Sequence, residues 1–269
     1  MATKEALLTT LDEESAADLQ SNGGTGAGGF LQLPAEGVKP MPEAHFLASL
    51  CDRLLLPVCP EGAHCKHRCR LTGRLCGAPL DRRGKHARMC KLGGGVDGRH
   101  NYIRDWLCAA YSECTGLPAN TEQRVPEWDL INPEDGTLEE ARLDVATSDV
   151  ATGAALFMDV VVKTAFSIDP AVLRCWARGA GTAASDAAAG KRRRYAEAGA
   201  SLIPFALEAG GRPSDEAAAF VRLMGSVYTE THGSEDGEPA PSPVGRLWQE
   251  LSTLLQRGNA ELILSAIGR

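Results

Sequence analysis

The sequence has no long apolar run, and aromatic side chains are few, at 5% of its 269 residues. No apolar stretch approaches the roughly 20 residues that a membrane-spanning helix needs. The N-terminus also lacks a basic stretch followed by an apolar one, which is the pattern of a secretory signal. We therefore expect a soluble, intracellular protein that has no membrane partner.

Cysteine is present in an odd number, nine, and the cysteines are unevenly placed. Six of them fall between Cys51 and Cys90, in a stretch that also contains His64, His67 and His86. Thiols inside the cell are kept reduced, so clustering of this kind favours a metal site over disulfide bonds.

The clustered residues include soft donors at a spacing that suits a tetrahedral zinc ion. Our first choice is a set of four ligands: Cys69, Cys76, His86 and Cys90. Cys65 could replace Cys69 in this set, and His64 and His67 are further possible donors. We expect zinc to hold the surrounding loops together as a zinc knuckle.

Charge is unevenly distributed along the chain, although the net charge is −7. Residues 61–104 contain eleven Lys or Arg against three acidic residues, which gives this block a charge of +8. The first forty residues and the last sixty carry an acidic excess. A basic block in an acidic protein is typical of a localised phosphate-contacting face, although a solvated loop would look similar.

Two aspartates stand inside segments whose composition otherwise indicates buried strands. Asp144 lies within residues 142–145, and Asp159 precedes three consecutive valines. A carboxylate costs several kcal/mol to bury unless it is paired or binds a cation. On neighbouring strands the two carboxylates could meet and bind magnesium, which takes oxygen ligands. Asp159 could instead pair with Arg142 or Lys163.

A basic segment further along could supply the positive charge that phosphodiester cleavage needs besides a metal. Lys191, Arg194 and Tyr195 are spaced i, i+3 and i+4, so on a helix they share one face. Two cations and a hydroxyl on one face could hold a phosphate and order water. The run could also be a solvated helix face.

The order of helical and strand patterns indicates an α/β fold on a small mixed sheet. We expect a flexible leader with a glycine-rich stretch at 1–44, followed by a helix and zinc knuckle at 45–98. The core at 99–211 should contain a helix, three strands, a helix and a strand, in that order. C-terminal helices should follow at 212–269, joined by an acidic, Pro-rich linker at 232–243.

Several short motifs between residues 45 and 230 follow one another in a distinctive order. They are Cys76-Gly-Ala-Pro-Leu-Asp-Arg-Arg-Gly-Lys-His86-Ala-Arg-Met-Cys90, Arg99-His100-Asn, Arg142-Leu-Asp144-Val, Phe157-Met-Asp159, Lys191-Arg-Arg-Arg-Tyr195 and Pro204-Phe-Ala-Leu-Glu208. As an ordered set they resemble the restriction-like endonuclease domain at the C-terminus of site-specific non-LTR retrotransposon proteins.

The resemblance implies a PD-(D/E)XK nuclease-like core whose lysine has moved from the strand to the following helix. It implies that Asp144 and Asp159 bind magnesium and that Lys191 is the migrated lysine. Tyr195 matches the tyrosine of the family's K-x-x-K-Y pattern, and Arg194 stands where the family has its second lysine.

The function implied is that of a magnesium-dependent DNA endonuclease with a structural zinc, located in the nucleus, with DNA or RNA as its partner. The side chains that we expect to contact DNA are Arg82, Arg83, Lys85, Arg88, Arg99 and Arg194. The alternative is a zinc-knuckle nucleic-acid-binding remnant without catalysis. Glu122 and Glu208 are lesser candidates for the site.

Overall fold

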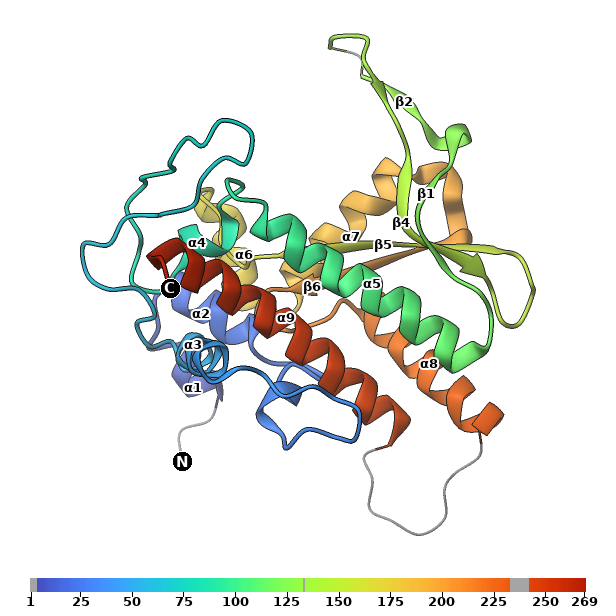
Figure 1. The fold of residues 1–269 in the computed structure, drawn as a ribbon, viewed down its shortest axis with the longest axis horizontal. Helices are drawn as coiled ribbons and strands as arrows, with labels where there is room; N and C mark the ends of the chain where they lie inside the picture. Colours follow the sequence, from blue (N-terminus) through green and yellow to red (C-terminus); the bar gives the residue numbers. More distant parts are fainter. Residues whose placement is uncertain (1–3, 133, 233–241) are drawn as a thin grey trace.

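A four-stranded mixed sheet lies at the centre of the molecule (Figure 1), which is a computed structural model that describes residues 4–132, 134–232 and 242–269. The strand order is β1-β4-β5-β6, with the first two pairings antiparallel and β5–β6 parallel. The strands are β1 (Asn120–Arg124), β4 (Arg142–Ser148), β5 (Ala155–Lys163) and β6 (Leu202–Glu208). The predicted α/β class with a small mixed sheet is confirmed.

The register of the central strands brings the two aspartates together. β5 and β6 pair continuously from Phe157–Leu202 to Lys163–Glu208. By contrast, β4 and β5 pair only as far as Val145 and Met158. Asp144 and Asp159 are the next residues along each strand, so they face each other where the two strands separate.

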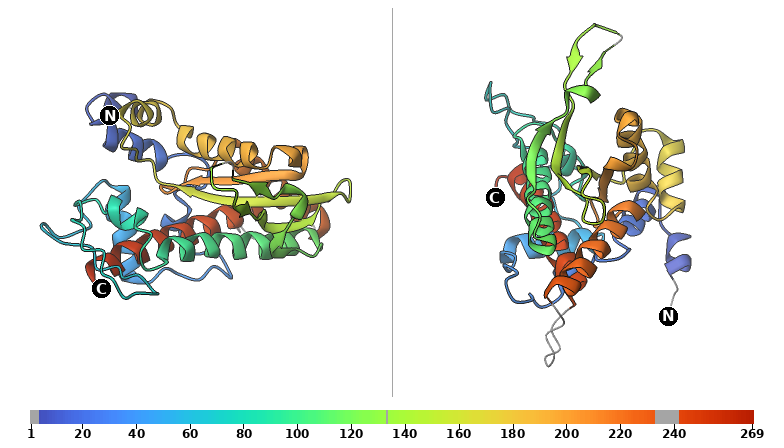
Figure 2. Two further views of the ribbon diagram at one scale, coloured as in Figure 1. Left: turned by 90° about the horizontal axis from the view of Figure 1, so that it is seen from above. Right: turned by 90° about the vertical axis from the view of Figure 1, so that its right-hand side faces the viewer.

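Helices cover both faces of the sheet (Figure 2). On one face, Ile103, Leu107 and Tyr111 share a stripe of α5 and pack on Met158 and other strand side chains. On the other face, small side chains of α7 allow a close approach to β6. The covering helices are α5 (Gly95–Thr115), α8 (Asp215–His232) and α9 (Pro243–Ile267) on the first face, and α7 (Thr182–Arg194) on the second.

The helix predicted after residue 45 and the predicted C-terminal helices are present, while α6 (Pro170–Arg178) was not predicted. The helix expected after residue 45 is α3 (Glu43–Arg53), and α8 and α9 are the expected C-terminal pair. The linker predicted at 232–243 lies mostly outside the described residues. The unpredicted helix is α6 (Pro170–Arg178), whose start is capped by the Asp169 side chain.

The N-terminal segment is packed, so the prediction of a flexible leader was wrong. It forms α1 (Lys4–Leu8), α2 (Glu13–Ser21) and η1 (Gly29–Leu31). Ala16 and Ala17 of α2 share an apolar cluster with Trp176 of α6. A Cβ on Gly26 would come within 2.4 Å of the Trp248 ring. The glycines therefore allow close packing rather than flexibility.

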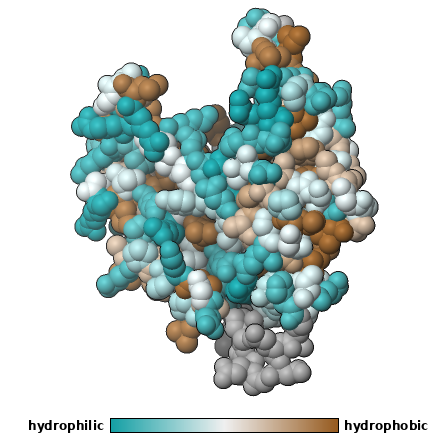
Figure 3. All heavy atoms as spheres, turned by 45° about the vertical axis from the view of Figure 1, so that its right-hand side comes forward, coloured by the Kyte–Doolittle hydropathy of each residue, from teal (hydrophilic) through white to brown (hydrophobic). Residues whose placement is uncertain are grey.

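A narrow hairpin projects from the sheet and ends in exposed apolar side chains (Figure 3). Its strands are β2 (Leu130–Ile131) and β3 (Leu138–Glu139), and the side chain of Ile131 is 71% exposed. Arg194 anchors its base, because its guanidinium donates to the carbonyls of Trp128 (3.2 Å) and Glu139 (3.1 Å). Among the described residues, no helix is both long and apolar enough to cross a membrane.

Candidate functional site

Three cysteines and one histidine converge beside the C-terminal end of α9. One ligand atom from each of Cys65, Cys76, His86 and Cys90 lies within 4.8 Å of all the others. The Cys65 and Cys90 sulfurs are 3.9 Å apart, and Cys76 Sγ is 3.4 Å from His86 Nε2. Zn–S bonds of about 2.3 Å at tetrahedral angles place two sulfurs about 3.8 Å apart. The donor set therefore fits a zinc ion.

Cys65 rather than Cys69 completes this set, so our first choice of ligand was wrong. The backbone N–H of Cys65 donates to Ala78 (2.8 Å), which holds Cys65 opposite Cys76. Cys69 lies further out, where its N–H donates to the Arg74 carbonyl (2.9 Å). Both cysteines are compatible with the spacing, and only the pairing of the loop distinguishes them.

The remaining candidate donors lie outside the cluster. His64 is exposed, and Nε2 of His67 lies 2.9 Å from Ser265 Oγ and 3.1 Å from the Leu262 carbonyl of α9. Burial raises the pKa of the Cys65 thiol to about 12. A thiolate at this position therefore needs the positive charge of a metal.

Two basic residues of the knuckle are paired with the N-terminal segment, against the prediction that they contact DNA. They lie in or beside α4 (Lys85–Met89). Arg83 Nη2 donates to Asp18 of α2 at 2.6 Å, and Lys85 forms ion pairs with Glu14 and Asp18. Part of the basic block is thus paired with acidic residues of the N-terminal segment.

Three more of the residues predicted to contact DNA serve internal contacts. Arg88 is buried and donates to Asp52 at 2.7 Å. Arg99 is buried and donates to Asn259 at 2.7 Å. Arg194 anchors the hairpin. Of the predicted six, Arg82 alone is exposed.

The carboxyl group of Asp144 is held by two groups from different elements. Its Oδ2 accepts a hydrogen bond from the Val160 N–H (2.6 Å), a backbone group at the point where β4 and β5 separate. Its Oδ1 lies 2.8 Å from Nε2 of His100, which α5 carries. The carboxyl is thereby fixed beside Asp159.

Asp159 is 3% exposed, and its carboxyl is paired with a lysine. Lys191 of α7 places Nζ 2.9 Å from Asp159 Oδ2, which forms an ion pair. Beyond this ion pair, that oxygen accepts no hydrogen bond from the described residues. A buried carboxylate oxygen with free lone pairs is a candidate ligand for a cation.

The two carboxyl groups have opposite protonation tendencies. Burial raises the pKa of Asp159 to about 7 against the lowering effect of the Lys191 charge, and the hydrogen bond with Asp144 and its charge add to the rise. Burial also acts to raise the pKa of Asp144, but hydrogen bonding with His100 and Asp159 lowers it overall. Near neutral pH the pair therefore holds a proton that a cation could replace.

Tyr195 is buried beside this pair, on the side of Lys191. It packs with Leu143 and lies near the Trp128 ring. Burial raises its pKa to about 12, and the charges of Asp159 and Asp144 add to the rise. The structure thus brings together the four predicted residues Asp144, Asp159, Lys191 and Tyr195.

The lesser candidates lie outside this group, and one further residue was missed. Glu122 is exposed and pairs with Arg104. Glu208 is buried and accepts a hydrogen bond from the Ala184 N–H (3.2 Å), so it caps the first turn of α7. His100 was overlooked, although it stands within one of the motifs described above.

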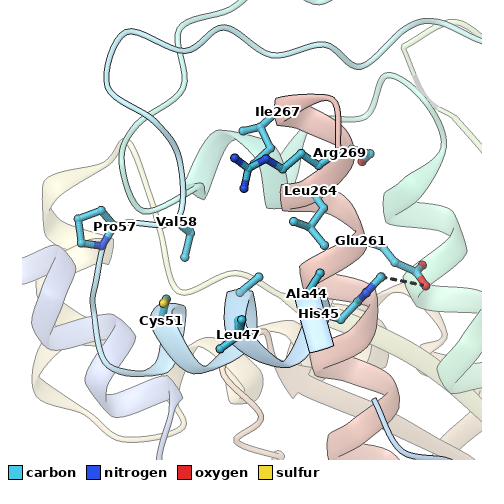
Figure 4. A pocket seen from close by; sticks show the side chains of 12 residues that line it. Ala44, His45, Leu47, Cys51, Pro57, Val58, Glu261, Leu264, Ile267 and Arg269 are labelled. Atoms are coloured by element: carbon cyan, nitrogen blue, oxygen red, sulfur yellow. Dashed lines mark ion pairs between the residues drawn. The ribbon is translucent and has the colours of Figure 1, made fainter. Parts of the chain in front are cut away.

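A separate hollow of about 600 Å³ lies between α3 and α9 (Figure 4). Its walls are largely apolar, and His45 and Glu261 form an ion pair there at 4.0 Å. It shares no residue with the acidic pair or the cysteine cluster.

No model of a known protein family matches this chain, and no curated protein matches it either.

Proposed function

We propose that this protein is a magnesium-dependent DNA endonuclease that hydrolyses phosphodiester bonds. The observation that carries the proposal is the buried pair of Asp144 and Asp159, with Lys191 Nζ 2.9 Å from Asp159 Oδ2. A proton held at a pKa of about 7 is readily replaced by a divalent cation. The ordered motifs that resemble a restriction-like endonuclease domain support the same conclusion.

Each residue of the group has a role in this proposal. Asp144 and Asp159 hold the magnesium ion, which when bound supplies a Lewis acid for the phosphate and lowers the pKa of water. Lys191 turns from Asp159 to the phosphate and offsets its developing charge. His100 and the Val160 N–H keep Asp144 in position. Tyr195 shields the two aspartates from solvent on the side that faces the hairpin.

The zinc knuckle serves in this proposal as a rigid support for DNA contacts. The Cys/His cluster shares an apolar cluster with Ile263 and Ala266 of α9. Basic residues on its outer loops remain exposed, namely Lys66, Arg68, Arg70, Arg74, Arg82 and Lys91. These side chains, rather than the buried ones, are the proposed phosphate contacts.

A nicking assay on supercoiled plasmid DNA tests the function. Zinc-loaded wild type should nick the plasmid when magnesium is added, and Asp159→Asn should lower the rate at least about a hundredfold, because it removes a metal ligand. Asp215→Asn, at an exposed position of α8, is the matched control and should retain the wild-type rate. Equal nicking by all three proteins would overturn the proposal.

The alternative function is nucleic-acid binding without catalysis. It is favoured by the ion pair of Lys191 with Asp159, which already offsets part of the buried charge. Under this alternative the wild type binds DNA but does not nick it with any divalent cation.

A further inference from the structure

We propose that Leu71 is a wedge that enters the minor groove of duplex DNA and partly unstacks one base step. The inference rests on the proposed function, since it takes DNA as the partner. It goes further by naming a residue outside the acidic pair and by stating what that residue does to the DNA, which is to kink the duplex where the side chain is inserted.

Leu71 stands at the tip of a loop, residues 65–78, that projects from the body of the molecule (Figure 2). Its side chain is 96% exposed. Leu33 and Ile168 are also 92% exposed, but each has an acidic residue within three positions. Residues 66–75, by contrast, contain four Lys or Arg and no acidic residue. Leu71 is therefore distinguished by its basic surroundings and not by its exposure alone.

The turn that carries Leu71 is closed by backbone hydrogen bonds. The Cys69 N–H donates to the Arg74 carbonyl (2.9 Å), and the Gly73 N–H donates to the Cys69 carbonyl (2.8 Å). Gly73 has a left-handed backbone (φ +68°), which glycine adopts without strain. The turn thus holds Leu71 outward before any DNA is bound, so little conformational entropy is lost on insertion.

The base of the loop is fastened at two points. Cys65 and Cys76, which belong to the zinc-binding set, lie on opposite arms of the loop, so a bound zinc ion joins the arms. The Lys66 N–H donates to the Ala266 carbonyl of α9 (2.8 Å), which supports the loop from the helix side. A wedge must withstand the force with which stacked bases resist separation, and this loop has the support to do so.

Three arginines of the loop supply the phosphate contacts that a wedge needs. Arg68, Arg70 and Arg74 are exposed and, unlike Arg83, form no ion pair with a carboxylate of the described residues. Arg70 is oriented by the hydrogen bond from its Nε to the Gly93 carbonyl (3.1 Å), so its terminal nitrogens point to other partners. Proteins that kink DNA from the minor groove combine such arginines with an inserted apolar side chain.

The cost of unstacking determines which DNA the protein prefers. Mismatched base pairs and pyrimidine–purine steps unstack more easily than other steps. The wild type should therefore bind a short duplex with a central mismatch at least about tenfold more tightly than the fully paired duplex of the same length. This preference does not require knowledge of a target sequence.

Fluorescence anisotropy with the zinc-loaded protein and no added magnesium measures this preference without cleavage. Leu71→Ser should bind both duplexes equally, whereas Leu71→Met, which keeps an apolar side chain, should retain the preference. Leu33→Ser, at a similarly exposed position, is the control and should behave like the wild type. Energy transfer between dyes at the two duplex ends should show a bend that Leu71→Ser abolishes. Unchanged zinc content verifies that each variant is folded.

The contributions of charge and of insertion are separable in the same assay. Arg74→Ala should weaken binding to both duplexes by the same factor and reduce the slope of log affinity against log salt by about 0.9. Leu71→Ser should leave that slope unchanged, because it removes no charge. A Leu71 variant with the wild-type preference and bend overturns the inference. An equal effect of Leu71→Ser on a single strand or on duplex RNA also overturns it, since neither presents the minor groove of B-form DNA.

Failure of the inference and failure of the function give different results. If Leu71→Ser behaves like the wild type while plasmid nicking depends on Asp159, the inference is overturned and the nuclease proposal stands. If the preference depends on Leu71 but no plasmid is nicked, the wedge is supported together with the alternative function of binding without catalysis. If the wild type binds neither duplex, both proposals are overturned.

Discussion

At the scale of single residues, the protonation of Asp159 sets a dependence of stability on pH. Its pKa is raised from 3.8 to about 7 in the folded protein, first by burial. Between these two values the folded state binds more protons than the unfolded state, so the free energy of unfolding falls as the pH rises. Above pH 7 ionisation of the buried Asp159 lowers the free energy of unfolding by its full amount, on the order of 4 kcal/mol.

Replacing this carboxyl should therefore stabilise the cation-free protein at alkaline pH. We expect Asp159→Asn to unfold at a higher temperature than wild type at pH 8.5, with no divalent ion present beyond the bound zinc. The difference in free energy of unfolding between Asp159→Asn and wild type should be about 2 kcal/mol smaller at pH 5.5, because wild-type Asp159 is then protonated. Calorimetry at several pH values measures this, and an advantage independent of pH would contradict it.

The cysteine cluster gives a second prediction for single residues. Cys65→Ser should reduce the bound zinc below one ion per chain and lower the melting temperature, since the cluster packs on α9. Cys69→Ser should retain one zinc and melt like the wild type. Zinc release measured with a chromogenic chelator distinguishes the two, and zinc loss from the Cys69 variant alone would refute the ligand assignment.

The sequence predicted part of this site. Asp144 and Asp159 stood out because carboxylates are costly in buried strands, and Lys191 and Tyr195 followed from the helical spacing and the resemblance. His100 could not be found in this way, because its contact with Asp144 depends on how α5 crosses the sheet. The choice between Cys65 and Cys69 likewise depends on backbone pairing that spacing does not fix.

At the scale of elements, the glycine-rich N-terminal stretch shows where composition misleads. Glycine is common both in flexible chains and where two backbones approach closely. The partners that decide between these possibilities, Trp248 and Gln249, lie near the other end of the chain. The missed α6 is different, since Asp169 and Pro170 are ordinary signals for a helix start and could have been recognised.

Alanine substitutions of two glycines measure this packing. Both Gly26 (φ +75°) and Gly37 (φ +81°) have left-handed backbones, but only at Gly26 would a Cβ meet another group. Gly37→Ala should cost about 1 kcal/mol of stability from backbone strain, and Gly26→Ala about 3 kcal/mol, because it also overpacks Trp248. Denaturant unfolding gives both values, and equal losses would mean that the segment is not packed.

At the scale of the whole molecule, part of the basic block is paired with acidic side chains of the N-terminal segment, through Arg83 and Lys85. A local charge counted from the sequence therefore overstates the charge available for DNA. The fold class and the charge asymmetry were readable from sequence, but the pairing of Arg83 and Lys85 with α2 was not, because it depends on tertiary contacts.

Variants of two neighbouring arginines test separately the contribution of an exposed charge and of an ion-paired charge to DNA binding. Arg82 is exposed, whereas Arg83 is bound to Asp18. Arg82→Ala should reduce the slope of log affinity for DNA against log salt by about 0.9, the loss of one phosphate contact. Arg83→Ala should leave the slope unchanged. Fluorescence anisotropy at several salt concentrations measures both, and the reverse order would contradict the assignment of the DNA contacts to the exposed residues.

The packing of the N-terminal segment also determines when the protein can fold during translation. The Phe30 N–H donates to Ser252 Oγ (3.2 Å), and the Ala35 N–H donates to Gln249 (2.8 Å). The ribosome synthesises these partners long after the residues that need them. Residues 26–35 must therefore remain undocked while the sheet assembles, and contacts so distant in sequence are slow to form. Nascent chains stalled before α9 emerges should consequently remain sensitive to protease within residues 26–35.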